Sequence, residues 1–166
     1  MSTYFEKISY NNFENAMLDL DKNLTKHDIQ KIYDGIKIPK RATKSSAGYD
    51  FSSTIDFTLN PGEEIKIPTG IRAKMNDDQV LLIFPRSSLG FKFRFQLNNS
   101  VGVIDADYYY SENEGHIFIK MFNGGTKSIQ LNTGNAFAQG IFINYLLTDD
   151  DDATNIRNGG LGSTNV

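Results

Sequence analysis

The chain has 166 residues, about the length of one domain, with 17 basic and 20 acidic residues and a formal net charge of −3. This acidic balance argues against a protein that binds nucleic acid or an anionic membrane through a basic surface. The sequence has no cysteine, which excludes disulfides, thiolate zinc sites, iron–sulfur clusters and cysteine nucleophiles, and its two histidines argue against a multi-histidine metal site.

Residues 1–39 are predicted to form a small helical extension. Residues 11–14 have the spacing of a capping box ahead of the apolar residues 16–18. Thr25 and Asp28 precede further apolar residues at helical spacing, from Ile29 to Ile36. We therefore expect two helices that pack as a cap on a larger domain.

From residue 47 onward, apolar residues alternate with polar ones or form short continuous runs, as in half-buried and buried strands. The pattern runs through residues 65–71, 80–84, 91–95, 117–120, 129–131 and 136–147. Turn sequences at Pro61-Gly62, Gly124-Gly125 and Thr133-Gly134 separate several of these segments. Many short strands without long helices between them predict an all-β domain over residues 40–147, built as a jelly-roll-like β-barrel.

Two features of this region that suggest chemistry have simpler explanations. Residues 91–95 (FKFRF) mix basic and aromatic side chains, as nucleic-acid-binding surfaces do. Because the two kinds alternate, we expect a half-buried strand with Lys92 and Arg94 in solvent. His116 has no partner at a metal-binding or catalytic spacing and is interpreted as a structural histidine.

Residues 148–166 contain almost no core-forming side chains and predict a flexible C-terminal tail. The acidic run 149–152 lacks the glycine that an EF-hand loop needs at its sixth position, so it is interpreted as a solvated hinge. Arg157 and the following glycine-rich stretch, with Ser163 and Thr164, offer a guanidinium, N–H groups and hydroxyls that suit a phosphate. An unstructured tail has the same composition, so the pattern leaves both interpretations open.

A second phosphate-binding candidate and a candidate base lie within the predicted strands. Arg86, Ser87 and Ser88 directly follow a predicted buried strand, where they suit a polyphosphate. Asp105 ends an apolar stretch, and partial burial there would keep its carboxylate poorly solvated, as a general base requires. Each of these segments, taken singly, is more typical of an ordinary turn.

Taken together and in order, five segments resemble the five motifs of the trimeric dUTP diphosphatases (dUTPases). The segments are residues 47–51 (AGYDF), 85–90 (PRSSLG), Asn99 with 102–108 (GVIDADY), 134–139 (GNAFAQ), and Arg157 with 159–164 (GGLGST). The resemblance extends over roughly residues 40 to 166 and leaves only the helical extension outside it.

The resemblance implies a jelly-roll β-barrel and a homotrimer with three active sites, each built from all three chains and closed by the tail of one of them. It also implies the hydrolysis of dUTP to dUMP and pyrophosphate by in-line attack of water on the α-phosphorus. Mg²⁺ is the implied cofactor, and Asp50 is the residue implied to hold it through water.

The same resemblance assigns roles to individual residues. It implies that Asp105 activates the water and touches the deoxyribose 3′-OH, and that Tyr108 packs on the deoxyribose. Asn99 would read the uracil edge together with the backbone of Gly102 and Ile104. Leu161 of the tail would cover the uracil. The remaining substrate-binding positions, mostly at the phosphates, are Arg86, Ser87, Ser88, Gln139, Arg157, Ser163 and Thr164.

The sequence departs from the family pattern in four places. Ala136 stands where the fourth motif usually has arginine, so a cationic contact is lost or is supplied by a lysine or arginine elsewhere. Leu161 replaces an aromatic residue, and the spacing between Arg157 and Gly159 is one residue shorter. Residues 109–114 lengthen the segment between the tyrosine of the third motif and Gly115.

Two other functions stay open at this level. A dCTP deaminase of the same fold needs a glutamate that activates water, and no obvious match is found. A regulatory protein-binding module would use residues 109–114 or the N-terminal extension to hold a partner. The longest apolar run, 80–84, is far below the roughly 18 residues of a membrane helix. With no signal-peptide pattern at the start, the expected location is the cytoplasm, or the host cytoplasm for a virus-encoded protein.

Overall fold

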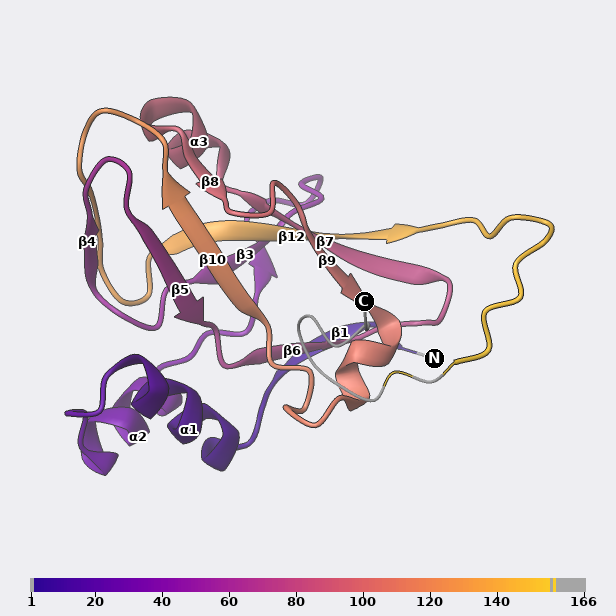
Figure 1. The fold of residues 1–166 in the computed structure, drawn as a ribbon, viewed down its shortest axis with the longest axis horizontal. Coiled ribbons are helices and arrows are strands. Elements are labelled where there is room, and N and C mark those ends of the chain that lie inside the picture. The colour runs from indigo at the N-terminus through magenta and orange to yellow at the C-terminus, as the bar shows by residue number, and fades with distance from the viewer. Residues whose placement is uncertain (1, 156, 158–166) are drawn as a thin grey trace.

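Antiparallel strands are the main secondary structure of the chain in a computed structural model that describes residues 2–155 and 157 (Figure 1). The strands are β1 (Tyr4–Lys7), β2 (Lys40–Arg41), β3 (Tyr49–Ser52), β4 (Phe57–Leu59), β5 (Glu64–Pro68), β6 (Ile71–Lys74), β7 (Gln79–Pro85), β8 (Phe95–Leu97), β9 (Gly102–Asp105), β10 (Phe118–Asn123), β11 (Ile129–Leu131) and β12 (Ala136–Asn144). The helices are α1 (Tyr10–Leu20), α2 (Lys26–Asp34), α3 (Ser87–Phe93) and the 3₁₀ helix η1 (Ala106–Tyr110).

The largest sheet has five strands in the order β2-β3-β12-β7-β9, and β12 lies at its centre. Smaller sheets pair β5-β10-β8, β11-β4 and β1-β6. The mostly-β fold expected from the alternating pattern is therefore confirmed, and the described strands are divided among four sheets instead of closing into one ring. β12 ends three residues before the predicted strand end, and the predicted domain limits at residues 39 and 147 stay predictions.

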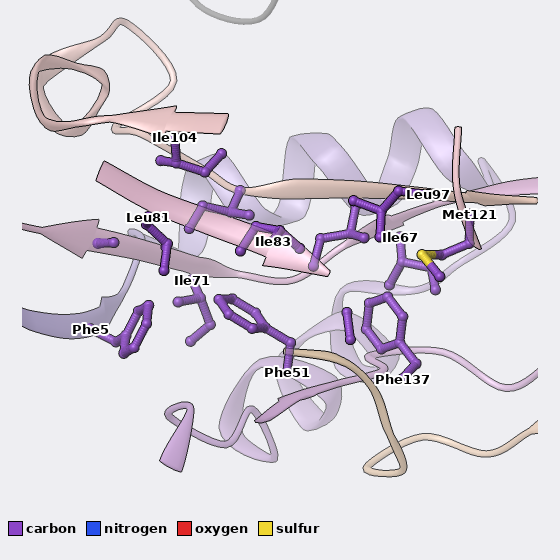
Figure 2. Close-up of a cluster of buried hydrophobic side chains, with 14 of the residues drawn as sticks. Phe5, Phe51, Ile67, Ile71, Leu81, Ile83, Leu97, Ile104, Met121 and Phe137 are labelled. Atoms are coloured by element: carbon purple, nitrogen blue, oxygen red, sulfur yellow. The ribbon is translucent and has the colours of Figure 1, made fainter. Parts of the chain in front are cut away.

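The core lies between these sheets and is filled by the inward-facing residues of every described strand except the short, exposed β2 (Figure 2). Phe51 on β3, Leu81 and Ile83 on β7, and Phe137 on β12 come from three strands, and each is at most 1% exposed. Burying a side chain of this size stabilises the fold by roughly 1.5–3 kcal/mol. The period-two residues that predicted the strands are thus the residues that hold the sheets together.

The N-terminal extension contains the two predicted helices and one strand that the prediction missed. α1 is capped by Ser9, so the predicted capping box at residues 11–14 is wrong, whereas Thr25 and Asp28 form both bonds of a capping box at α2. Ile8, Phe13, Met17 and Ile29 form a separate small core under the helix pair. β1 precedes α1 and pairs with β6, which ties the extension to the sheets.

Residues 91–95 do not form the strand expected from their alternation. Ser87–Phe93 is the helix α3, Arg94 ends it in the left-handed region at φ 51°, and β8 begins only at Phe95. A helix also brings residues four apart onto one face, and Leu89 and Phe93 use that spacing to pack on the core. Phe91 is left 94% exposed. None of the helices described here is long and apolar enough to span a membrane.

Candidate active site

Three predicted site residues meet at the end of β7. Asp50 on β3 lies directly opposite Gln139 on β12, so their side chains share one face of the sheet. The Arg86 Nε lies 3.3 Å from Asp50 Oδ1, and the Gln139 Nε2 donates a hydrogen bond to the Pro85 carbonyl oxygen at 3.2 Å. Gly48 makes room for this arrangement, because a Cβ there would lie 2.3 Å from Gln139 Oε1. A carboxylate, a guanidinium and an amide therefore converge.

The first turn of α3 adds hydroxyl groups to this cluster. Arg86 is the N-cap of α3, and Ser87 and Ser88 follow it with exposed side chains. The first N–H groups of a helix have no partner within the helix and point outward, together with the positive end of its dipole. Hydroxyls, N–H groups and a guanidinium at one end of β7 suit an anion with several oxygens.

A second cluster lies where β9 runs into η1. Asp105 ends β9 with its side chain half exposed, and Asp107 follows in η1. Arg157 contacts both carboxylates: its Nε donates to Asp107 Oδ1 at 2.8 Å, and its Nη2 pairs with Asp105 Oδ2. The carboxylate predicted to activate water is therefore held in an ion pair in this conformation.

Tyr108 is more enclosed than its predicted role in contacting a sugar requires. Its side chain is 3% exposed, and its hydroxyl donates to the His116 carbonyl oxygen at 2.7 Å. Burial raises the pKa of Tyr108, against smaller opposing effects of Asn113 and Arg157. The guanidinium carbon of Arg157 lies 5.9 Å from the ring centroid. Arg157 thus covers the tyrosine as well as Asp105.

Of the residues predicted to read uracil, Asn99 lies in the connection between β8 and β9, and Gly102 and Ile104 lie on β9. Asn99 is exposed, and its carbonyl accepts a hydrogen bond from Val101 N–H at 2.7 Å. Gly102 and Ile104 are buried and pair with β7, so the side chain of Ile104 faces the core and only its backbone is available to a ligand. Leu161, Ser163 and Thr164 lie outside the described residues.

The two clusters stand at opposite ends of β7 (Figure 1). Asp105 pairs with Val80, whereas Arg86 follows the other end of the strand, six positions further on. At about 3.3 Å per residue, the clusters are about 20 Å apart. The α-phosphorus of a nucleotide is joined to its sugar through a single oxygen. One nucleotide therefore cannot place its α-phosphorus in both clusters of the same chain.

The metal-binding capacity of the site is small. Across residues 2–155 and 157, no three His, Cys, Asp or Glu side chains group as a metal site. Asp50 is a single, partly exposed carboxylate, and it borders a cavity of about 530 Å³ whose lining includes Lys40, Arg41 and Ala136. A single carboxylate suits a Mg²⁺ ion that keeps several water ligands and is also coordinated by the phosphate oxygens of a nucleotide. One such ligand is too few for a site in which the protein alone coordinates the ion.

A comparison of the amino-acid sequence with those of known proteins agrees with the order and chemistry of these site residues. The sequence model of the dUTPase family matches residues 34–165. The chain belongs to the dUTPase family. It is 44% identical over 133 residues to the deoxyuridine 5′-triphosphate nucleotidohydrolase of Lactococcus lactis, covering 78% of this chain and 89% of that protein. It is 36% identical over 138 residues to the protein of the same name from Desulfitobacterium hafniense, covering 78% of this chain and 88% of that protein.

Solved structures give the same result for the fold. The Streptococcus mutans dUTPase has a TM-score of 0.65 at 35% identity, over 88% of this chain and 98% of that one. A mutant dUTPase of Staphylococcus aureus phage phi11, described as coordinating a structural Mg(II) ion, has a TM-score of 0.65 at 18% identity, over 93% and 98% of the two chains. The phage protein shares the dUTPase fold, and at this identity the likeness extends no further.

Sequence reasoning missed one residue of this dUTPase that contacts the site and one that joins the neighbouring segment to the N-terminal extension. Asp107 was identified only as part of the third motif, and its ion pair with Arg157 joins positions 50 residues apart, for which the sequence gives no local signal. Glu114, in the lengthened segment, contacts the N-terminal extension more than 100 positions away. Only the segment's unusual length drew attention to it.

Proposed function

We propose that the chain hydrolyses dUTP to dUMP and pyrophosphate. Membership of the dUTPase family and the retained motif residues support this activity. The observation that carries the proposal is the pair of complementary clusters, one with a carboxylate and a tyrosine and the other with groups that suit phosphates. A cytoplasmic location goes with this proposal.

Asp105 is the group best placed to activate water. It takes a proton from the water as the oxygen forms a bond to the α-phosphorus. The bond from that phosphorus to the oxygen bridging to the β-phosphate breaks, and pyrophosphate leaves with the electron pair. Positioning and electrostatic stabilisation of the phosphoryl oxygens supply most of the catalysis in reactions of this kind.

Arg86, Ser87 and Gln139 would hold the phosphates, and Asp50 would bind Mg²⁺ through water. Mg²⁺ neutralises phosphate charge when it is bound with the nucleotide. Asp50 must then exchange its contact with Arg86 for one with the hydrated ion, while Arg86 turns to the phosphates. Lys40 lies directly opposite Asp50 on β2 and is placed to replace the cation that Ala136 lacks.

The distance between the clusters supports a homotrimer with shared sites. The phosphate cluster of one chain would meet the Asp105 cluster of its neighbour, and the tail of a chain would close the site. Arg157 must first leave Asp105 and Asp107, because its present position blocks the approach of water and sugar. Binding of the nucleotide therefore competes with this resting contact.

Pyrophosphate release by the purified chain, measured with each dNTP and UTP, tests the activity. We expect release from dUTP only, and a loss of at least a hundredfold in kcat for Asp105→Asn, since positioned bases contribute roughly 10²–10⁴-fold. Ammonia release from dCTP would instead indicate a deaminase. Absence of turnover on dUTP would refute the proposal.

Complementation tests the shared site. Asp105→Asn and Arg86→Ala chains are each expected to be inactive alone. Refolded together, they form some sites that combine an intact Arg86 from one chain with an intact Asp105 from the other, so activity should return. If mixed trimers form and stay inactive, both clusters serve the same chain and the shared-site geometry is wrong.

A further inference from the structure

The lengthened segment after η1 is bound to the N-terminal extension. Ser9 N–H donates to Glu114 Oε2 at 2.7 Å, and Asn12 Nδ2 donates to Glu114 Oε1 at 2.6 Å. Ser9 is the N-cap of α1, and Asn12 is the third residue of that helix. A glutamate at that third position commonly accepts the N-cap N–H in a capping box. Here Glu114 takes that place from 105 positions away along the chain.

A second set of contacts joins the same two regions. The Tyr109 hydroxyl is hydrogen-bonded to Glu6 of β1. Arg72 of β6 pairs with Glu6, with its Nη2 2.9 Å from Oε1, and its guanidinium carbon lies 4.4 Å from the centroid of the Tyr109 ring. The hydrogen bond to Glu6 and burial both raise the pKa of Tyr109, so its hydroxyl stays a donor at neutral pH. Both ends of the segment are thus fastened to the extension.

The segment also surrounds Tyr108 directly. Asn113 Nδ2 donates to the Tyr108 hydroxyl at 2.9 Å, and the Ser111 hydroxyl donates to the Tyr108 carbonyl oxygen at 2.6 Å. Gly115 passes so close that a Cβ there would lie 2.8 Å from that carbonyl oxygen. Displacement of this segment would therefore be transmitted to the ring predicted to select the sugar.

The charge of Glu114 suits this arrangement. Burial acts to raise its pKa, but the hydrogen bonds from Ser9 and Asn12 and the nearby Arg72 outweigh burial and lower it. The carboxylate is therefore ionised at neutral pH and lies at the positive end of the α1 dipole. Glu114 also has φ 59°, a left-handed conformation that costs a non-glycine residue free energy, and its contacts offset that cost.

We propose that the N-terminal extension positions the Asp105–Tyr108 segment for catalysis, with Glu114 as the positioning residue that joins the two. The inference rests on the proposed dUTP hydrolysis and extends it to a region outside the family's sequence model, which begins at residue 34. The extension and residues 109–114 hold one another through the hydrogen bonds of Glu114 and Tyr109. That either region also holds a regulatory partner stays a prediction.

Glu114→Ala tests the proposal, and Glu112→Ala is its control. Glu112 is exposed in the same segment and has no hydrogen bond or ion pair to another described residue. We expect Glu114→Ala to lower kcat/KM for dUTP on the order of tenfold, since small misplacements of catalytic groups cost up to about a hundredfold. Relative activity on UTP should rise, because the sugar-facing tyrosine loses its support. The control should stay within about twofold of the unsubstituted chain.

Hydrogen exchange and a double-mutant cycle separate positioning from general destabilisation. Backbone exchange of residues 106–115 should speed up in Glu114→Ala at a temperature where the protein stays folded, while exchange in β7 and β12 stays unchanged. Asn12→Ala should give a smaller change in the UTP-to-dUTP ratio, and the double variant should not exceed Glu114→Ala alone. An unchanged ratio and kcat in Glu114→Ala, with normal turnover of the unsubstituted chain, would overturn the positioning role only. Failure of the unsubstituted chain to hydrolyse dUTP would overturn both proposals.

Discussion

His116 should make the stability of this protein fall as the pH drops below neutrality. The imidazole is 1% exposed, its Nε2 accepts the Gly70 N–H at 2.9 Å, and its ring lies 4.0 Å from that of Phe118. Burial, with a smaller effect of Lys66, lowers the pKa of His116 to about 3, against an opposing effect of Glu114. Protonation would also break the bond from Gly70, because a protonated nitrogen cannot accept it.

The sign and size of the effect follow from the two pKa values. In the unfolded chain His116 binds a proton below about pH 6.5, whereas the folded chain binds it only near pH 3. Unfolding therefore takes up a proton in this interval, and the free energy of unfolding falls as the pH falls. At about 1.4 kcal/mol per pH unit, protonation of His116 alone should lower the free energy of unfolding, relative to neutral pH, by about 2 kcal/mol at pH 5 and about 5 kcal/mol near pH 3.

Urea unfolding at pH 7.5, 6.5, 5.5 and 5.0, at one fixed protein concentration, measures this dependence in the unsubstituted chain and in His116→Gln. Glutamine can still accept the Gly70 N–H and does not titrate. Between pH 7.5 and 5.0, the free energy of unfolding of His116→Gln should therefore fall by about 2 kcal/mol less than that of the unsubstituted chain. Ile117→Val is the control, because it removes buried volume next to His116 and should shift the whole curve down in parallel. Parallel curves for the unsubstituted chain and His116→Gln would refute a buried, neutral imidazole.

Two further predictions concern glycines that the site requires. In Gly48→Ala the new Cβ would displace the side chain of Gln139, so we expect a severalfold higher KM for dUTP with a melting temperature within a few degrees of the unsubstituted chain; an unchanged KM would mean that Gln139 does not contact the substrate. Gly115 has φ 72° and touches the Tyr108 backbone, so Gly115→Ala should lower the free energy of unfolding by roughly 1–3 kcal/mol in chemical denaturation. Equal stability would show that the segment can relax away from Tyr108.

The fold was largely predictable because one face of nearly every strand is buried. The alternation at Ile129 and Leu131, which are both buried, and at Ile65 and Ile67, which are partly and fully buried, follows directly from that burial. The same signal failed at residues 91–95, since five residues are too few to separate a period of two from helical contacts four apart. β1 was missed because its pairing with β6 spans more than 60 positions and leaves little local pattern.

The members of the candidate site were also predictable, but their grouping was not. The order of the motifs identified Asp50, Arg86 and Gln139. In the structure, the register of β3 against β12 places Asp50 and Gln139 opposite one another. Nothing in the sequence indicated that Asp105 would lie at the other end of β7, because that distance depends on which residue of β9 pairs with Val80. Glu114 lay still further from prediction, since its partners are backbone and amide groups that carry no charge pattern.

The placement of the two clusters at opposite ends of β7 has a consequence for mixtures of variant and normal chains. In the proposed shared-site trimer, the two clusters of one chain belong to two different sites. A chain defective only in Asp105 disables one site of its trimer, so activity falls in proportion to the fraction of normal chains. A chain defective in both clusters disables two sites, and activity then falls as the square of that fraction. Such an allele would be partly dominant, although neither defect alone would be.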